Sequence, residues 1–95
     1  MVVHSLTPEF NTASISRGGI FHVDLHEGGI ISHKWNLEVT SGKATFLGET
    51  NPGVAGISEK WFKAEFEAGD IEIVATSLVG GSPSDKKHTF KIQVI

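Results

Sequence analysis

Hydrophobic and polar residues alternate along most of the chain, in short runs separated by turn-forming residues. Phe21, Val23 and Leu25, for example, would share one face of a strand, with polar residues on the other face. Runs of this kind at regular intervals, without a helical period, are typical of an all-β sandwich. The pattern predicts seven strands, at residues 13–15, 20–25, 35–40, 43–48, 60–67, 71–78 and 88–95.

The alternation also predicts how these strands are arranged. A strand that is hydrophobic on one face alone suits an antiparallel sheet whose other face meets water. We therefore expect an all-β antiparallel sandwich of about seven strands, with a single domain over residues 1–95. Trp35 would begin the third strand on the inward face, a position that usually belongs to the core of such domains.

The connections between the predicted strands differ in length. Those at residues 26–34, 49–58 and 79–87 are long, whereas the others are short turns. Because connections alternate between the two ends of such a sandwich, the three long ones would lie at one end. Binding residues concentrate on loops that a rigid scaffold holds in place. We therefore interpret this end as a binding surface.

Composition and charge narrow the range of partners. The 95 residues include 8 basic and 11 acidic side chains, for a net charge of −3, and no dense Lys/Arg cluster, so we expect no nucleic acid partner. No apolar run approaches the roughly 20 residues of a membrane span, so we expect no membrane partner. The N-terminus lacks a basic region followed by an apolar run, so no signal peptide is expected. A cytoplasmic and an endosomal or lysosomal location both stay open.

Catalytic and cofactor-binding patterns are weak in this sequence. It contains no cysteine, no nucleophile-elbow pattern, and no phosphate- or dinucleotide-binding fingerprint. His22 and His26 are four residues apart, which on a strand separates them by roughly 13 Å at about 3.3 Å per residue. Even with His33 from across the loop, a shared metal ion is not expected. We therefore expect a protein that is not an enzyme and binds no metal or other cofactor.

The order of these features resembles that of the chagasin-type inhibitors of papain-family cysteine proteases, which include the amoebiasins. In that family a strand ending in Leu leads to Asn-Pro-Thr-Thr-Gly, and a Trp follows three residues after that Gly. Leu25 and Trp35 have the same separation here, and residues 28–32 occupy the motif position as Gly-Gly-Ile-Ile-Ser. Ile30 and Ile31 thus replace the threonines that contact the protease cleft in the family.

The resemblance extends from about Asn11 to Val94. The family's second loop is glycine-rich, as is the segment Gly-Val-Ala-Gly-Ile-Ser at residues 53–58. The third loop of the family usually carries Arg-Pro-Trp, and residues 79–81 hold Val-Gly-Gly at that position. Further matches are the Ala-Gly turn at Ala68-Gly69 and the Phe at Phe90.

The resemblance implies that the sandwich is immunoglobulin-like. It also implies a reversible proteinaceous inhibitor that inserts the loops 26–34, 49–58 and 79–87 into the active-site cleft of a papain-family protease. We expect it to act as a monomer. The residues expected to contact the protease are Gly28, Gly29, Ile30, Ile31, Ser32, His33, Gly53, Val54, Ala55, Gly56, Ile57, Trp61, Val79, Gly80 and Gly81.

Two of these positions allow a second interpretation. Ile30 and Ile31 either tuck back onto the end of the core, as Ile commonly does, or form an exposed apolar tip that fits a pocket in the partner. Trp61 either covers the polar face of its strand or contacts a partner, since Trp is enriched in binding hot spots. We favour the exposed tip for the isoleucines. For the whole chain, the alternative is an immunoglobulin-like protein-interaction module, or a glycan-binding module that uses Trp61, without a protease target.

Overall fold

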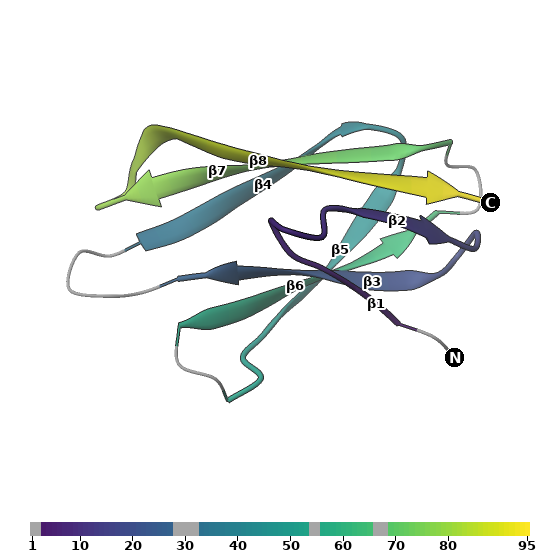
Figure 1. Cartoon of the computed structure of the whole chain (residues 1–95), viewed down its shortest axis with the longest axis horizontal. Coiled ribbons are helices and arrows are strands. Elements are labelled where there is room, and N and C mark those ends of the chain that lie inside the picture. Colours follow the sequence, from purple (N-terminus) through teal and green to yellow (C-terminus); the bar gives the residue numbers. More distant parts are fainter. Residues whose placement is uncertain (1–2, 28–32, 54–55, 66–68) are drawn as a thin grey trace.

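Two four-stranded sheets face each other in the computed structural model, which describes residues 3–27, 33–53, 56–65 and 69–95, the side chain of His33 excepted (Figure 1). One sheet has the strand order β1-β3-β6-β5 and the other the order β2-β8-β7-β4. This is the layout of an immunoglobulin-like sandwich, which confirms the predicted fold class. The strands are β1 (His4–Leu6), β2 (Thr12–Ile15), β3 (Ile20–His26), β4 (His33–Ser41), β5 (Ala44–Thr50), β6 (Ile57–Ala64), β7 (Ile71–Val79) and β8 (Ser82–Val94).

Strand pairing is antiparallel inside each sheet and parallel at one edge of each. β1 pairs in parallel with β3, and β2 in parallel with β8, whereas the other four pairs are antiparallel as expected. The chain turns at Thr7 and Phe10, which exchange two backbone hydrogen bonds of 3.1 Å, and so crosses from one sheet to the other. The sequence pattern did not predict β1, because three residues with one buried side chain, Leu6, show no measurable alternation.

The core lies between the sheets and follows the predicted alternation. Trp35 is buried with 8% of its surface exposed, which confirms its assignment to the core. Phe21 and Phe62 stack with 5.5 Å between ring centroids. Of the residues that the structure describes, the buried hydrophobic ones are Leu6, Ile15, Phe21, Val23, Leu25, Trp35, Phe62, Ala64, Ile71, Ile73, Ala75, Phe90 and Ile92. None of the described elements is a helix that could cross a membrane.

The prediction of a long third loop at residues 79–87 is wrong. β7 continues to Val79 and β8 begins at Ser82, so only Gly80 and Gly81 connect them. Both glycines have positive φ angles, 59° and 86°, as a two-residue turn of type I′ in a β-hairpin requires. Pro83 is tolerated in β8 because β2 covers only residues 91–94, which leaves this part of the strand at a sheet edge. The run of Gly, Ser, Pro and Asp had indicated a loop.

The connections of the sandwich are sorted between its two ends. At the end on the left in Figure 1, β3, β5 and β7 stop and β4, β6 and β8 start, and we call this the loop end. β1 begins and β8 ends toward the opposite end. The three connections β3–β4, β5–β6 and β7–β8 therefore leave from the same end, as the sequence predicted, although the third is a hairpin turn.

Candidate functional site

Strand pairing brings the three connections of the loop end together. His26 at the end of β3 is paired with Ile57 at the start of β6, so the β3–β4 and β5–β6 connections leave from neighbouring strands. In the other sheet His33 at the start of β4 is paired with Val79 at the end of β7. The register therefore places the strand ends from which the connections leave beside one another at the loop end.

Part of the predicted contact surface lies outside the described residues. Seven of the predicted contact residues fall there, and their predicted contacts stay predictions: Gly28, Gly29, Ile30, Ile31, Ser32, Val54 and Ala55. The structure describes what holds the connections to the sandwich on either side of these positions.

The glycines of the second connection adopt the backbone angles expected of them. Gly53 and Gly56 have φ angles of 88° and 81°, a region that favours glycine. The amide of Gly53 donates a 2.8 Å hydrogen bond to the side chain of Asn51. The carbonyl of Gly56 accepts a 2.6 Å hydrogen bond from the amide of Glu27, which ties the second connection to the first.

Trp61 lies on the outer face of β6, away from the core. Its indole ring packs on His22, with 4.6 Å between ring centroids, and its Nε1 donates a 2.7 Å hydrogen bond to Oγ1 of Thr50. Thr50 is the last residue of β5, where the second connection begins. Trp61 therefore covers part of the sheet and also adjoins the loop end, so a contact with a partner stays a prediction.

The third connection presents a narrow tip. Val79 has 43% of its surface exposed, and Gly80 and Gly81 are exposed beside it. A hollow of about 370 Å³ is lined by Lys34, Leu78 and these two glycines. A partner can approach this tip closely, because the glycines carry no side chains.

A buried charged group at the base of the loop end was missed by the sequence analysis. Lys60 has 8% of its surface exposed, and its Nζ lies 3.2 Å from Oε2 of Glu27 and in direct contact with Oε2 of Glu49. We call these three residues the Lys60 cluster. The sequence does contain a signal for it, because Lys60 alternates in phase with the buried Phe62 and Ala64.

The Lys60 cluster links the bases of the β3–β4 and β5–β6 connections and is also bonded to the opposite sheet. Glu27 follows β3, Glu49 lies near the end of β5, and Lys60 lies near the start of β6. The Oε2 atom of Glu27 also accepts a 2.9 Å hydrogen bond from the amide of Trp35 in the other sheet, and Nε1 of Trp35 donates a 2.8 Å bond to the carbonyl of His26. These bonds fix the bases of the first two connections against each other.

The electrostatics of the cluster favour the charged form of Glu49. The hydrogen bond from Lys60 holds the pKa of Glu49 below its ordinary value, and a second hydrogen bond from Ser58 acts in the same direction. The Glu49 side chain has 57% of its surface exposed, so water screens much of this interaction. The described ends of the first two connections thus rest on a base of ion pairs.

Two solved structures are similar to this chain in fold. The crystal structure of the cysteine protease inhibitor EhICP2 from Entamoeba histolytica matches with a TM-score of 0.77 at 17% sequence identity, over 98% of this chain and 95% of that chain. The solution structure of amebosin matches with a TM-score of 0.70 at 20% identity, over 100% of both chains. No family model and no curated protein matches the sequence.

At these identities the likeness establishes the shared fold. It covers the chain almost from end to end, so it includes the strands that frame the loop end as well as the core. One of the two similar proteins is a cysteine protease inhibitor, the class of protein that the sequence resembles.

Proposed function

We propose that this protein reversibly inhibits papain-type cysteine proteases by inserting the connections of the loop end into the active-site cleft. The observation that supports this most is the full-length fold similarity to a cysteine protease inhibitor. Because one fold can carry unrelated functions, the fold alone does not decide the activity. The convergence of three connections at one end supplies the second support, since a cleft is filled by a projecting edge.

The proposed division of labour follows from the three connections. The β3–β4 connection would enter the cleft near the catalytic Cys–His pair, and the other two would lie on either side of it. Nothing would be cleaved, because the inserted backbone crosses the cleft without presenting a bond in attack geometry. The protein would therefore act by occupying the site, and it would have no catalytic residues of its own.

The Lys60 cluster would contribute to affinity by holding the loop bases in place before binding. Ordering mobile loops during association lowers affinity, and a scaffold that has already ordered them avoids that loss. Glu27 bonds to Lys60, to the amide of Trp35 and, through its own amide, to Gly56, so the base of the first connection is fixed at three points.

Ile30 and Ile31 are the proposed residues that enter the cleft. Relative to threonine, isoleucine lacks a hydroxyl and so forgoes a hydrogen bond worth about 0.5–1.5 kcal/mol. It adds apolar surface, and burying one such side chain contributes about 1.5–3 kcal/mol. The exchange therefore preserves affinity for a protease whose cleft offers an apolar pocket.

An inhibition assay against papain tests the proposal. We expect competitive inhibition and, by mass spectrometry, recovery of the intact chain. Ile31→Asp should abolish inhibition, because an unpaired carboxylate would enter an apolar pocket, while the thermal midpoint stays unchanged. Ile31→Val is the matched control and should retain most of the inhibition, since it removes one methylene.

Three results would contradict the proposal. They are an inactive wild-type protein, steady cleavage within residues 26–34 with fading inhibition, and an Ile31→Asp variant that unfolds more easily while its folded fraction still inhibits. The first of these results, obtained with folded protein, would also favour the protein-interaction or glycan-binding alternative.

A further inference from the structure

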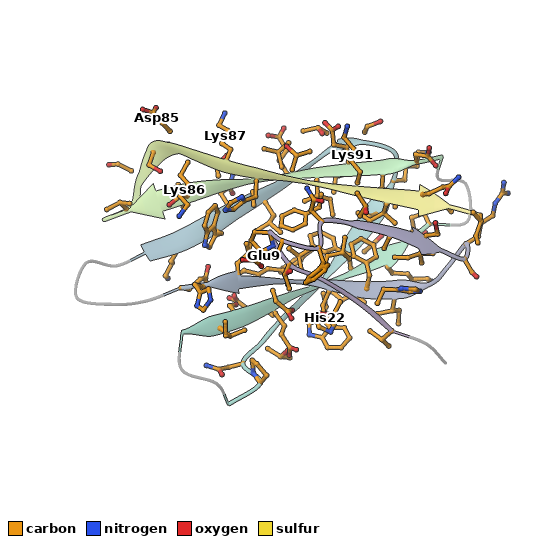
Figure 2. All side chains as sticks on the ribbon, in the orientation of Figure 1. Glu9, His22, Asp85, Lys86, Lys87 and Lys91 are labelled. Atoms are coloured by element: carbon orange, nitrogen blue, oxygen red, sulfur yellow. The ribbon has the colours of Figure 1, made fainter. Side chains whose placement is uncertain are left out.

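Three side chains with metal-ligating atoms meet on the outer face of the β1-β3-β6-β5 sheet. They are His22 and Asp24 of β3 and Glu59 of β6, and we call them the His22 cluster. Nδ1 of His22 lies 2.5 Å from Oδ1 of Asp24 and 3.8 Å from Oε2 of Glu59. One ligand atom from each residue lies within 4.8 Å of the other two. Figure 2 shows His22 on the side of β3 that faces away from β7 and β8.

The strand register creates this cluster. Asp24 is directly opposite Glu59 in the antiparallel pair of β3 and β6, and His22 is two residues along on the same face. Two carboxylates directly opposite each other repel, which makes this an unfavourable cross-strand pair unless a cation lies between them. Next to both carboxylates is the imidazole of His22, whose Nδ1 lies within 3.8 Å of an oxygen of each.

Neighbouring side chains hold the carboxylates in place. The second oxygen of Asp24 accepts a 3.0 Å hydrogen bond from the hydroxyl of Ser5, and the second oxygen of Glu59 accepts a 2.7 Å bond from the hydroxyl of Thr50. Each carboxylate thus keeps one oxygen bonded and directs the other toward His22. Hydrogen bonds of this kind orient the ligands in metal sites.

The cluster is also shielded from solvent to a degree that suits a bound ion. The side chains of His22, Asp24 and Glu59 have 13%, 21% and 17% of their surface exposed. Trp61 packs on the imidazole ring from the neighbouring strand. The ligand atoms are therefore partly desolvated, and one side of the site stays open to water.

We propose that His22, Asp24 and Glu59 bind a divalent transition-metal ion, with zinc as the best fit. Zinc takes imidazole nitrogen and carboxylate oxygen at about 2.0–2.2 Å, usually in tetrahedral geometry. Three protein ligands and one water complete that geometry. The ion would bind among these three ligand atoms and neutralise the repulsion between the two carboxylates. The carboxylate of Asp24 would move outward by less than about 1 Å to give tetrahedral spacing.

Imidazole is the ligand that decides the choice of metal. Magnesium and calcium prefer sites made of oxygen atoms, and this site offers one nitrogen and only two carboxylates from the protein. Zinc, nickel and copper accept imidazole readily. The site should therefore bind zinc in preference to magnesium, although the two ions carry the same charge.

Calorimetric titration of the metal-free, untagged protein with zinc chloride at about pH 7.5, where free imidazole is neutral, tests the proposal. We expect one zinc ion to bind per chain, and no heat from magnesium at the same concentrations. His22→Ala should weaken zinc binding at least about tenfold, since even changes to groups that only orient the ligands lower affinity by about 10–100-fold.

Two further variants keep the test independent of folding. Glu59→Gln has the same shape and can still accept the bond from Thr50, yet it should also weaken zinc binding about tenfold or more. His4→Ala is the matched control, because His4 lies in the adjacent β1 on the same face as the buried Leu6 and points away from the cluster. It should leave zinc affinity unchanged.

A spectroscopic measurement locates the ion directly. In the wild-type protein, zinc should shift the imidazole nitrogen resonance of His22 and leave that of His4 in place. The proposal is overturned if wild-type protein gives no binding heat, if magnesium gives the same response as zinc, or if His4→Ala weakens zinc binding as much as His22→Ala does.

Discussion

Two clusters of charged and titratable side chains lie back to back on β6 and differ in the nitrogen group that meets their carboxylates. The Lys60 cluster faces inward, where an ammonium group joins Glu27 and Glu49. The His22 cluster faces outward, where an imidazole lies between Asp24 and Glu59. Both contain two carboxylates, and neighbouring residues of one strand, Glu59 and Lys60, belong to different clusters.

The difference shows how the same composition gives two chemical outcomes. A lysine ammonium is charged throughout the physiological range, so the inward carboxylates have a permanent partner and serve the scaffold. An imidazole changes its charge near neutral pH, and its neutral form is a metal ligand. The inward cluster is therefore complete within the protein, whereas the outward one offers its ligand atoms to an added ion.

Lys60→Met should give the largest effect and would break the inward cluster. Methionine retains most of the buried stem but leaves Glu27 without its ion pair. Breaking a buried ion pair costs about 3–5 kcal/mol, and because Glu49 is largely hydrated we expect a loss of about 2–3 kcal/mol in the free energy of unfolding. Urea denaturation measures this, with the outward-facing Lys63→Met as the control. Equal effects of both variants would show that Lys60 has no special role.

Trp61→Ala should affect binding on the outward side. We expect it to weaken protease inhibition by about 1–3 kcal/mol, as truncation of a hot-spot residue does. The effect on folding should be small, because Trp61 lies outside the core, where its ring packs on His22 and bonds to Thr50. Inhibition constants and thermal midpoints of the variant distinguish a role of Trp61 in protease binding from a role in folding. A strongly lowered midpoint with unchanged affinity would make Trp61 a structural residue.

The pH dependence of stability should reveal the contribution of Glu49 in the Lys60 cluster. Because the pKa of Glu49 is lowered on folding, chiefly by the hydrogen bond from Lys60, its contribution is fully present above the ordinary value of 4.5 and is lost as pH falls through the folded value. Unfolding measured on the acid side of pH 4.5 should show this loss, and Glu49→Gln should reduce it. If the variant loses as much stability in acid as the wild-type protein does, Glu49 is not the group responsible for that loss.

Glu59→Gln should have the smallest effect, and of opposite sign. In the metal-free protein it removes one of two carboxylates that lie directly opposite each other, so we expect a gain of about 0.2–0.5 kcal/mol in the free energy of unfolding. Urea denaturation with Glu38→Gln, on the exposed face of β4, provides the comparison. A loss of stability in Glu59→Gln alone would contradict the repulsion between the two carboxylates.

The predictability of the candidate site differed from one connection to the next. The β5–β6 connection was placed correctly by its glycines, whose positive φ angles the structure shows at Gly53 and Gly56. The β7–β8 connection was assigned as a long loop, because Ser82 and Pro83 are typical turn residues. In the structure Gly80 and Gly81 alone make the turn, since a two-residue hairpin matches the twist of the strands it joins.

The sequence by itself determined the face on which each strand residue lies, because side chains alternate along a strand whatever its neighbours are. It therefore predicted the buried Phe21, Val23, Leu25 and Trp35, and its phase also carried Lys60 inward. Only the tertiary structure decided which side chains meet, because pairing partners are set by register between distant strands. The pairing of Asp24 with Glu59 joins residues 35 positions apart, and no local pattern in either strand encodes it.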